Sequence, residues 1–252
     1  MATYACSDLH GMLHFYKAIK EKLEPEDTVF FLGDAGDRGP HPWETIKAIL
    51  DDPQFVYIKG NHEDMLCRAL SDYIDTGCPD YYSMSQLSRN GGDTTFEEAI
   101  ADPEMEQYYR RLLRLPTITE YISTSQERII LSHAGFTPWK DDWYDDDEEK
   151  KDITYRQPSS QDLIWDRDHF LDEWTMEDCV DCFIVHGHTP VPYLLDDIDP
   201  ACLMGEIEPG ALVYCGGRKT CIDTGAVFTG ICVLLDLDTW DEDVFMSDPY
   251  MS

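Results

Sequence analysis

The amino-acid sequence predicts an α/β fold with a mostly parallel sheet, and three observations carry this prediction. In the first 60 residues, short apolar runs of strand length alternate with longer amphipathic stretches of helical period. The alternation of strand and helix is typical of βαβ units. Each apolar run is also followed directly by a polar segment that contains Asp, His or Asn. Parallel sheets bind ligands at the carboxyl ends of their strands, so these segments are the candidate site.

The first elements follow from the apolar runs in chain order. Strands are expected at residues 3–6, 28–32 and 55–58, each rich in β-branched or aromatic side chains. Helices are expected at residues 12–23 and 43–50. Pro40 and Pro42 lie just before the second helix, where proline suits a helix start.

The pattern changes after residue 68. Turn-rich pieces surround one expected helix at 103–115, and strand signals return at 128–131, 182–185 and 231–237. The acidic run at 141–152 is expected to be a solvated loop. Because no repeat or Pro/Ser-rich linker divides the chain, we expect one domain over 1–252, with an insertion at about 68–126 that shapes access of the substrate.

Composition excludes several classes of protein. The chain has 252 residues, 19 of them basic and 51 acidic, for a formal net charge of −32. Binding to phosphate backbones depends on Lys and Arg, so no nucleic-acid partner is expected. The sequence contains neither a long apolar run nor a signal-peptide pattern, so we expect no membrane partner and a cytoplasmic location.

The nine cysteines are odd in number and offer one CxxC pair, Cys179 and Cys182. A zinc or redox site at this pair is an open alternative. The favoured interpretation is a set of reduced thiols in a cytoplasmic protein, with this pair serving as small buried residues on a helix.

Five polar segments follow apolar runs and are expected to meet at the edge of one sheet. They read SDLHG at 7–11, GDAGDRG at 33–39, GNHE at 60–63, SHAG at 132–135 and HGHTP at 186–190. Carboxylates, imidazoles and an amide without thiolate suit divalent manganese, iron or zinc. The set exceeds what one ion needs, and two ions sharing a carboxylate would use it fully. Arg38 and Arg167 are candidates for bidentate hydrogen bonds to a phosphoryl group.

These segments resemble the motifs of the calcineurin-like metallophosphoesterase superfamily, specifically its phosphoprotein phosphatase branch. GDAGDRG and GNHE match outright, whereas Ser7 stands where the first motif of the family has glycine. The resemblance spans Asp8 to about Gly225 and extends to small bacterial and phage serine/threonine protein phosphatases and to symmetrical diadenosine tetraphosphatases. It implies a four-layer α/β/β/α sandwich with a helical insertion.

The resemblance also implies a role for each matching residue. The implied metal ligands are Asp8 and His10 for a first ion, Asn61, His133 and His188 for a second, and Asp34 between both. His188 is chosen over His186 because it is the histidine of a Gly-His pair followed by Thr-Pro. His62 is the implied general acid, oriented by Asp37, while Arg38 and Arg167 bind the phosphoryl group. A salt bridge to Arg38 alone is the alternative role for Asp37.

Two further stretches resemble family elements. Asn90, Gly91 and Gly92 are expected to line the substrate cleft, and the turn at Ile222 to Gly225 is expected to support the His188 loop.

The implied activity is that of a dinuclear-metal phosphomonoesterase, in which a hydroxide bridging two ions, manganese first among them, attacks phosphorus directly. The expected substrates are phosphoserine and phosphothreonine in proteins or peptides, and generic aryl phosphates. GNHE rather than GNHD favours this activity over a symmetrical diadenosine tetraphosphatase, and an inactive binding scaffold is the remote alternative. The acidic surface favours basic or neutral phosphopeptides.

Overall fold

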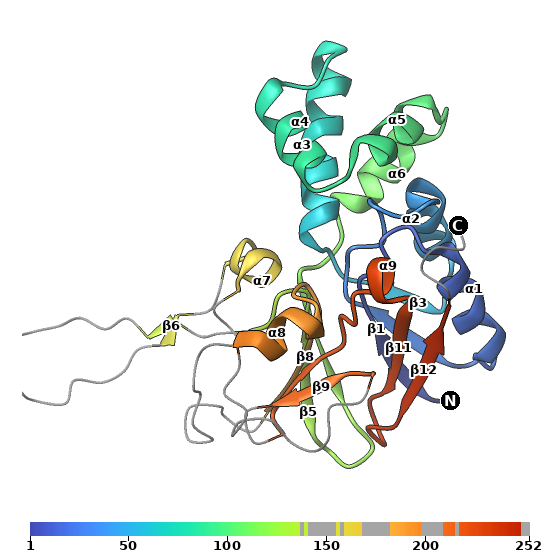
Figure 1. Ribbon diagram of the computed structural model, residues 1–252, viewed down its shortest axis with the longest axis vertical. Helices are drawn as coiled ribbons and strands as arrows, with labels where there is room; N and C mark the ends of the chain where they lie inside the picture. Colours follow the sequence, from blue (N-terminus) through green and yellow to red (C-terminus); the bar gives the residue numbers. More distant parts are fainter. Residues whose placement is uncertain are drawn as a thin grey trace, which may run out of the picture.

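Two five-stranded sheets stack face to face in the computed structural model, and helices cover their outer sides (Figure 1). The structure describes residues 1–136, 139–140, 155–156, 159–167, 182–197, 209–214 and 217–247. The strand order is β12-β11-β1-β2-β3 in the first sheet and β4-β5-β8-β10-β9 in the second. This arrangement is the α/β/β/α sandwich that the family resemblance implies.

The first sheet contains the strands predicted from the start of the chain. The parallel neighbours are β1 (Thr3–Cys6), β2 (Thr28–Phe31) and β3 (Phe55–Tyr57), while β11 (Ile231–Asp236) and β12 (Glu242–Met246) extend the sheet antiparallel. Helices α1 (Leu13–Lys22) and α2 (Pro42–Asp51) connect the parallel strands, and Pro42 stands at the start of α2. These predicted elements are confirmed to within two residues at each end.

The second sheet corrects the prediction that all five polar segments belong to one sheet. Its central strands β5 (Arg128–Ser132), β8 (Cys182–His186) and β10 (Lys219–Cys221) are parallel, and β4 (Ile118–Ile122) and β9 (Leu212–Tyr214) flank them antiparallel. A short apolar run does not indicate which sheet its strand joins, because the pairing of strands is decided by contacts between residues distant in sequence. A separate pair, β6 (Trp139–Lys140) and β7 (Tyr155–Arg156), lies outside both sheets.

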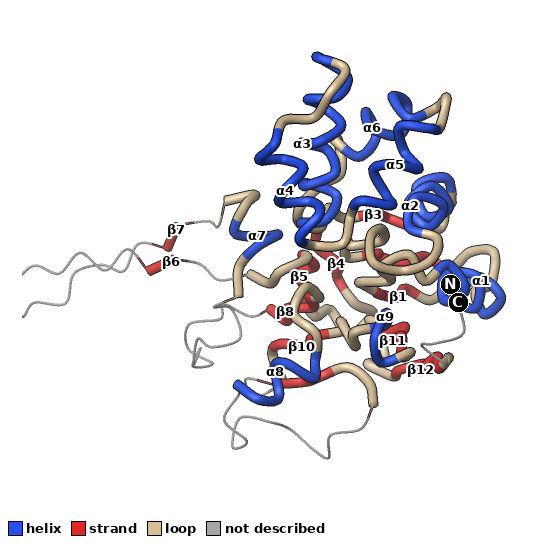
Figure 2. Tube along the Cα trace, turned by 45° about the horizontal axis from the view of Figure 1, so that its top comes forward, coloured by secondary structure: helices blue, strands red, loops and turns tan. Residues whose placement is uncertain are grey.

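Four helices follow β3 and rise on one side of the sheets (Figures 1 and 2). They are α3 (Asn61–Thr76), α4 (Tyr81–Arg89), α5 (Asp93–Ala101) and α6 (Met105–Leu112), and we call residues 61–112 the helical segment.

The predicted helix at 103–115 is confirmed as α6, but the prediction that turn-rich pieces rather than helices surround it is wrong. Gly77 closes α3 with a φ of 77°, and Asp80 caps α4 by accepting from the N–H groups of Tyr82 and Ser83. The residues that suggested turns are helix caps. The predicted insertion at 68–126 also included β4, which belongs to the second sheet. The single-domain organisation stays a prediction.

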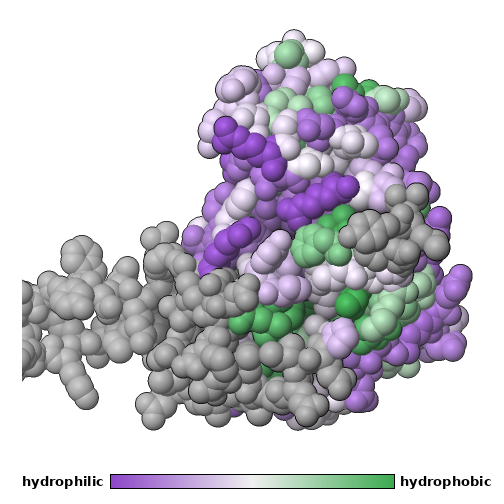
Figure 3. Space-filling model, viewed as in Figure 1, coloured by the Kyte–Doolittle hydropathy of each residue, from purple (hydrophilic) through white to green (hydrophobic). Residues whose placement is uncertain are grey.

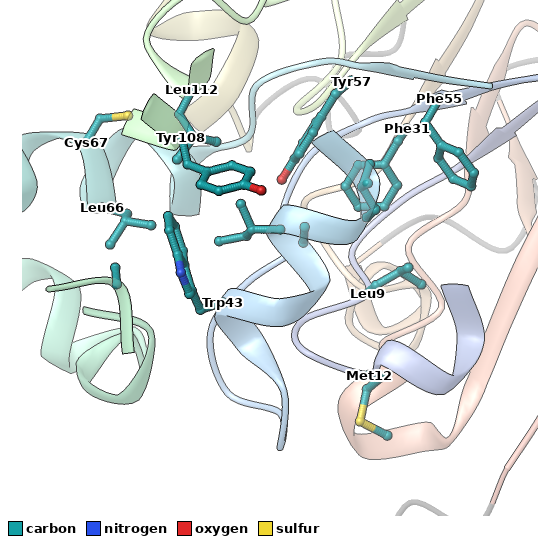
Figure 4. Packing of buried hydrophobic residues seen from close by; sticks show 14 of the residues in the cluster. Leu9, Met12, Phe31, Trp43, Phe55, Tyr57, Leu66, Cys67, Tyr108 and Leu112 are labelled. Atoms are coloured by element: carbon teal, nitrogen blue, oxygen red, sulfur yellow. The ribbon is translucent and has the colours of Figure 1, made fainter. Parts of the chain in front are cut away.

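Alternating side chains of the first sheet divide the core into two layers. Along β2 and at the residue that follows it, Val29 and Phe31 pack outward against the helices, whereas Phe30 and Leu32 face the second sheet. Figure 4 shows the outer layer, in which Phe31 and Tyr57 of the sheet lie beside each other and Trp43 of α2 lies near Tyr108 and Leu66 of the helical segment. Each fully buried side chain of this size contributes about 1.5–3 kcal/mol. The packed layers hold the strand ends in fixed positions.

Three short helices complete the described structure: α7 (Asp162–Trp165), α8 (Val191–Asp197) and α9 (Ala226–Thr229). Helix α8 covers the outer face of the second sheet, where Leu194 packs with Leu212 and Tyr214. No helix among the described residues is long and apolar enough to cross a membrane.

The predictions for the acidic run at 141–152 and for Cys179 lie outside the described residues. Cys182 begins β8, so the helix expected around the CxxC pair is wrong at this residue. Other described cysteines, namely Cys6, Cys67, Cys78, Cys221 and Cys232, are free thiols.

Candidate metal centre

The polar segments of both sheets meet at the strand ends, and their side chains are nearly inaccessible. Asp8 follows β1, Asp34 follows β2 and Asn61 opens α3 directly after β3, whereas His133 follows β5 and His188 follows β8. Their exposed fractions lie between 0% and 7%. The structure thus brings together ligand candidates that are as much as 180 residues apart in the chain, as between Asp8 and His188.

Four donor atoms, which we call the second cluster, lie close to one another. His133 Nε2 is 2.9 Å from Asn61 Oδ1, 3.2 Å from His188 Nδ1 and 3.4 Å from Asp34 Oδ2. His188 Nδ1 is also 2.9 Å from Asn61 Oδ1. Neighbouring ligands of one ion, each bound at about 2.1 Å, stand about 3 Å apart. The four atoms therefore have the spacing of ligands around one divalent ion.

The first cluster, formed by Asp8, His10 and Asp34, is wider. His10 Nε2 lies 4.0 Å from Asp8 Oδ1 and 3.8 Å from Asp34 Oδ2. His62 also offers a ligand atom within 4.8 Å of those of His10 and Asp34, so geometry alone places His62 beside this cluster. Because Asp34 also lies in the second cluster, the two clusters share one carboxylate.

The unpaired atoms of the site fit a bound cation. Among the described residues, Asp8 Oδ1 is a buried polar atom with no hydrogen-bond partner. Burial raises the pKa of Asp8 well above its usual range, and the neighbouring Asp223 raises it further. A buried carboxylate oxygen without a partner is costly, and a divalent ion would compensate it. The carboxylate, imidazole and amide donors suit the divalent transition metals.

Hydrogen bonds to backbone carbonyls fix two of the imidazoles. His10 Nδ1 donates to Gly36 O at 3.0 Å, and His133 Nδ1 donates to Leu32 O at 2.7 Å. A metal-ligating histidine usually donates a hydrogen bond from the ring nitrogen that does not bind the ion. This hydrogen bond orients the ring so that the lone pair of the other nitrogen points at the ion. Although burial opposes it, the charges of Asp34, Asp8 and Glu63 raise the pKa of His133 to about 10. An ion bound by His133 must therefore displace a proton.

The predicted acid pair is in contact. His62 Nδ1 lies 2.5 Å from Asp37 Oδ2, while Arg38 Nη2 lies 2.9 Å from His62 Nε2 and Arg38 Nη1 lies 2.8 Å from His10 Nε2. Since a guanidinium only donates, both Nε2 atoms accept, and the His62 proton resides on Nδ1 facing Asp37. Burial works against protonation of His62, but Asp34 and Asp37 raise its pKa overall. Asp37 thus pairs with the imidazole rather than serving Arg38 alone.

Arg167 and His186 differ in their relation to the metal-ligand candidates. The charge of Arg167 is close enough to His188 to contribute, after burial and His133, to lowering the pKa of His188. The ring of Trp165 lies 6.4 Å from that of His188. His186 instead donates from Nδ1 to Gly187 O at 3.0 Å and accepts from the Tyr214 hydroxyl at 2.6 Å. It supports the loop of His188 and is not part of either cluster.

Backbone strain is concentrated in the site. Eight described residues other than glycine have positive φ, and six of them are predicted site residues. These six are Asp8 (54°), His10 (43°), Asp34 (60°), Asp37 (68°), Arg38 (64°) and His188 (72°). Left-handed backbone costs about 1–3 kcal/mol at a residue other than glycine and persists where surrounding contacts impose it, often at functional sites. Loop geometry therefore supports the same residues that the motifs indicate.

Glu63 is a supporting residue to which sequence reasoning gave no role. Its carboxylate has no exposed surface and accepts from the N–H groups of Asp34 (2.9 Å), Ala35 (2.9 Å) and Gly60 (2.8 Å). The Tyr57 hydroxyl also donates to it at 2.7 Å. Glu63 thereby joins the loops that carry Asp34 and Asn61. Its place in the GNHE motif is the only sequence signal for this function.

Ser7 and the turn at Ile222 to Gly225 support other ligands. The Ser7 hydroxyl donates to Asp8 Oδ2, and the His188 N–H donates to the same oxygen at 3.2 Å, which leaves Oδ1 for a cation. Val191 N–H donates to Asp223 O at 2.8 Å, which ties the helix after His188 to that turn. The supporting role predicted for the turn is consistent with this contact.

The fold and these clusters define a metal-dependent phosphoesterase. A family model described as calcineurin-like phosphoesterase matches residues 1–217, so the chain belongs to that family. A bis(5'-nucleosyl)-tetraphosphatase PrpE [asymmetrical] of Geobacillus thermodenitrificans is 26% identical over 247 residues, covering 90% of this chain and 87% of the relative. Serine/threonine-protein phosphatase 2 of Escherichia coli is 29% identical over 139 residues, 53% of this chain and 58% of the relative.

Solved structures share the fold at low sequence identity. A metallophosphoesterase from Sphaerobacter thermophilus superimposes with a TM-score of 0.57 at 15% identity, covering 98% of this chain and 88% of that chain. This likeness supports the fold alone.

Proposed function

We propose that the chain is a dinuclear-metal phosphomonoesterase that hydrolyses phosphoserine, phosphothreonine and aryl phosphates. The observation that carries the proposal is a pair of donor clusters sharing Asp34 beside the His62–Asp37 pair and Arg38. Two divalent ions, manganese first among the candidates, would polarise phosphoryl oxygens there and supply a nucleophilic water near neutral pH. Asp8, His10, Asp34, Asn61, His133 and His188 would hold them.

The positive side chains of the site would bind the phosphoryl group. Arg38 reaches the space between His10 and His62, and a phosphoryl group would draw its guanidinium away from the two imidazoles into bidentate hydrogen bonds. Arg167, whose charge is close enough to His188 to contribute to lowering the pKa of that imidazole, would be a second positive contact for the group. Figure 3 shows hydrophilic side chains gathered where the helical segment meets the rest of the molecule.

His62 would then protonate the leaving oxygen. Once Arg38 has turned away, Nε2 is free to carry a proton, which passes to the alkoxide as the bond between phosphorus and the ester oxygen breaks. Nδ1 keeps its proton and its hydrogen bond to Asp37, which stabilises the charged imidazolium before the transfer. A serine alkoxide is a poor leaving group and needs this proton, whereas p-nitrophenolate departs without it.

The leaving group therefore tests the proposal. His62→Asn should lower kcat for a phosphoserine peptide by about 10²–10⁴-fold, the range of general acid catalysis, and lower that for p-nitrophenyl phosphate far less. Asp37→Asn should show the same asymmetry more weakly. An equal loss on both substrates, with both ions still bound, would contradict the acid role of His62. The absence of Mn²⁺-dependent turnover of any phosphoester by the wild-type chain would instead favour a binding scaffold.

A dinucleotide tetraphosphatase is the second candidate, and the PrpE relative favours it because the match covers 90% of this chain. The same clusters would serve hydrolysis of a phosphoanhydride, whose phosphate leaving group needs no protonation by His62. Rates on diadenosine tetraphosphate and on phosphopeptides, measured at matched Mn²⁺, distinguish the two activities. Chromatography of the products of diadenosine tetraphosphate distinguishes symmetrical from asymmetrical cleavage.

Cytoplasmic location stays a prediction, with which the free cysteine thiols are consistent.

A further inference from the structure

Asp37 and Arg38 form a strained turn that the helical segment holds in place. The two consecutive residues have φ values of 68° and 64°, a backbone conformation that residues other than glycine rarely adopt. The Asp37 N–H donates to Thr95 Oγ1 at 3.1 Å, and the Arg38 N–H donates to Gly91 O at 3.1 Å. Both backbone N–H groups of the turn are therefore bound by the helical segment.

The same helices also contact the functional ends of the two side chains. The Thr95 hydroxyl donates to Asp37 Oδ1, and Arg38 Nε donates to Asn90 O at 3.3 Å. A Cβ atom on Gly92 would lie 3.0 Å from Asp37 Oδ1 and 2.3 Å from Leu87 Cδ1, so the backbone is packed closely against the carboxylate. The stretch that was expected to line the substrate cleft thus supports the acid pair.

Thr95 is the residue through which this support reaches His62. Its side chain is fully buried on α5, and its hydroxyl accepts from the Asp37 N–H while donating to Asp37 Oδ1. With Oδ1 held in this way, Oδ2 is directed at His62 Nδ1, 2.5 Å away. Outer partners of this kind fix the orientation of a functional side chain that they support.

We propose that Thr95 is a positioning residue for the Asp37–His62 pair, so that the helical segment is part of the catalytic apparatus rather than only a boundary of the substrate cleft. Thr95 touches neither substrate nor reacting atoms and acts through Asp37. This inference rests on the proposed acid role of His62 for its kinetic consequence, but the positioning itself can be measured separately.

The kinetic experiment compares Thr95→Val, which keeps the shape and removes the hydroxyl, with Thr95→Ser, which keeps the hydroxyl. Thr95→Val should lower kcat for a phosphoserine peptide by about 10–100-fold, as for lost outer partners of active-site ligands, and for p-nitrophenyl phosphate by less than about threefold. Thr95→Ser should recover most of the rate. Thr94→Val is the matched control, because Thr94 is the preceding residue of α5 and is exposed.

A spectroscopic experiment separates positioning from activity. A strong imidazole-to-carboxylate hydrogen bond gives a far-downfield proton NMR resonance, which is assigned to His62 by its loss in His62→Asn. Thr95→Val should shift or broaden this resonance in the Mn²⁺-free chain, whereas Thr94→Val and Thr95→Ser should leave it in place. An unchanged resonance in a folded Thr95→Val chain overturns the proposal. So does an equal kinetic loss on both substrates in that variant when His62→Asn shows the asymmetry.

The outcomes for the two proposals remain distinguishable. If His62→Asn shows no leaving-group asymmetry but Thr95→Val still moves the resonance, the acid role fails and the positioning role stands. If Thr95→Val does not fold, Thr95→Ser takes over the test, and an altered resonance in that folded chain would contradict the proposal.

Discussion

The two donor clusters share Asp34 but differ in how completely the fold arranges them. In the second cluster, His133 Nε2 lies 2.9–3.4 Å from donor atoms of the other three residues. In the first, His10 Nε2 lies 3.8 Å and 4.0 Å from the two carboxylates, and Arg38 donates to it at 2.8 Å. The donor atoms of the second cluster already have the spacing of metal ligands. In the first cluster, the guanidinium of Arg38 occupies the lone pair of His10 Nε2.

The difference has a physical origin in the elements that carry the ligands. The second cluster joins the strand ends of both sheets, so the packed layer between the sheets sets its dimensions. The first cluster lies at the ends of β1 and β2 alone, next to the turn of Asp37 and Arg38. We therefore expect the second cluster to bind its ion more tightly, because less rearrangement precedes binding.

Removal of the shared carboxylate should have the largest effect. Asp34→Asn removes the charge that both clusters use, so both ions should bind more weakly and turnover should fall on the order of 10³-fold, as for other preorganised charge-stabilising groups. Metal content by mass spectrometry, measured beside turnover, checks this. Two tightly bound ions with the wild-type rate would contradict the sharing of Asp34.

A substitution confined to the second cluster should be the next most damaging. His188→Ala removes a donor 2.9 Å from Asn61 Oδ1 and should release the second ion, with a loss of turnover of at least about 10²-fold. His186→Ala is the matched variant two residues away, and it should cost about tenfold because His186 only supports the loop. A greater loss in His186→Ala would mean that the ligand is assigned to the wrong histidine.

Arg38→Ala should strengthen metal binding at the first cluster and weaken substrate binding. Without the guanidinium at His10 Nε2, the first ion should bind several-fold more tightly, on the order of 1 kcal/mol for one screened like charge. KM for p-nitrophenyl phosphate should rise, because a phosphoryl contact is lost. Calorimetric titration with Mn²⁺ measures the first effect. Arg167→Ala is the control and should raise KM without strengthening the first ion.

The last expected effect is a change with pH in the metal affinity of the second cluster. The pKa of His133, raised to about 10, leaves its imidazole protonated near neutral pH until an ion displaces the proton. Raising the pH removes this competition, so the apparent Mn²⁺ affinity should increase by up to about tenfold per unit between roughly pH 6.5 and 8.5. His133→Asn should flatten the dependence. An affinity that falls as pH rises would contradict the sign.

The sequence predicted more of the site than of its surroundings. Asp34, His62 and Asn61 were identified because their motifs keep a fixed order of residue types directly after strands, and this order is local information. The caps at Gly77 and Asp80 were local too, but they were interpreted as turns because a cap and a turn use the same residues. The assignment of strands to two sheets could not be predicted from the sequence, since strand pairing depends on partners distant in sequence.

By itself, the sequence determined the strand and helix pattern of the first 60 residues and the identities of the ligand candidates, because both depend on residue type and short spacing. Only the tertiary structure decided which donors stand within ligand distance, and that Arg38 lies against both His10 and His62. It alone placed Thr95 against Asp37 from 58 residues away. Such contacts arise when the two sheets and the helical segment pack, and no local spacing records the distance between side chains that packing brings together.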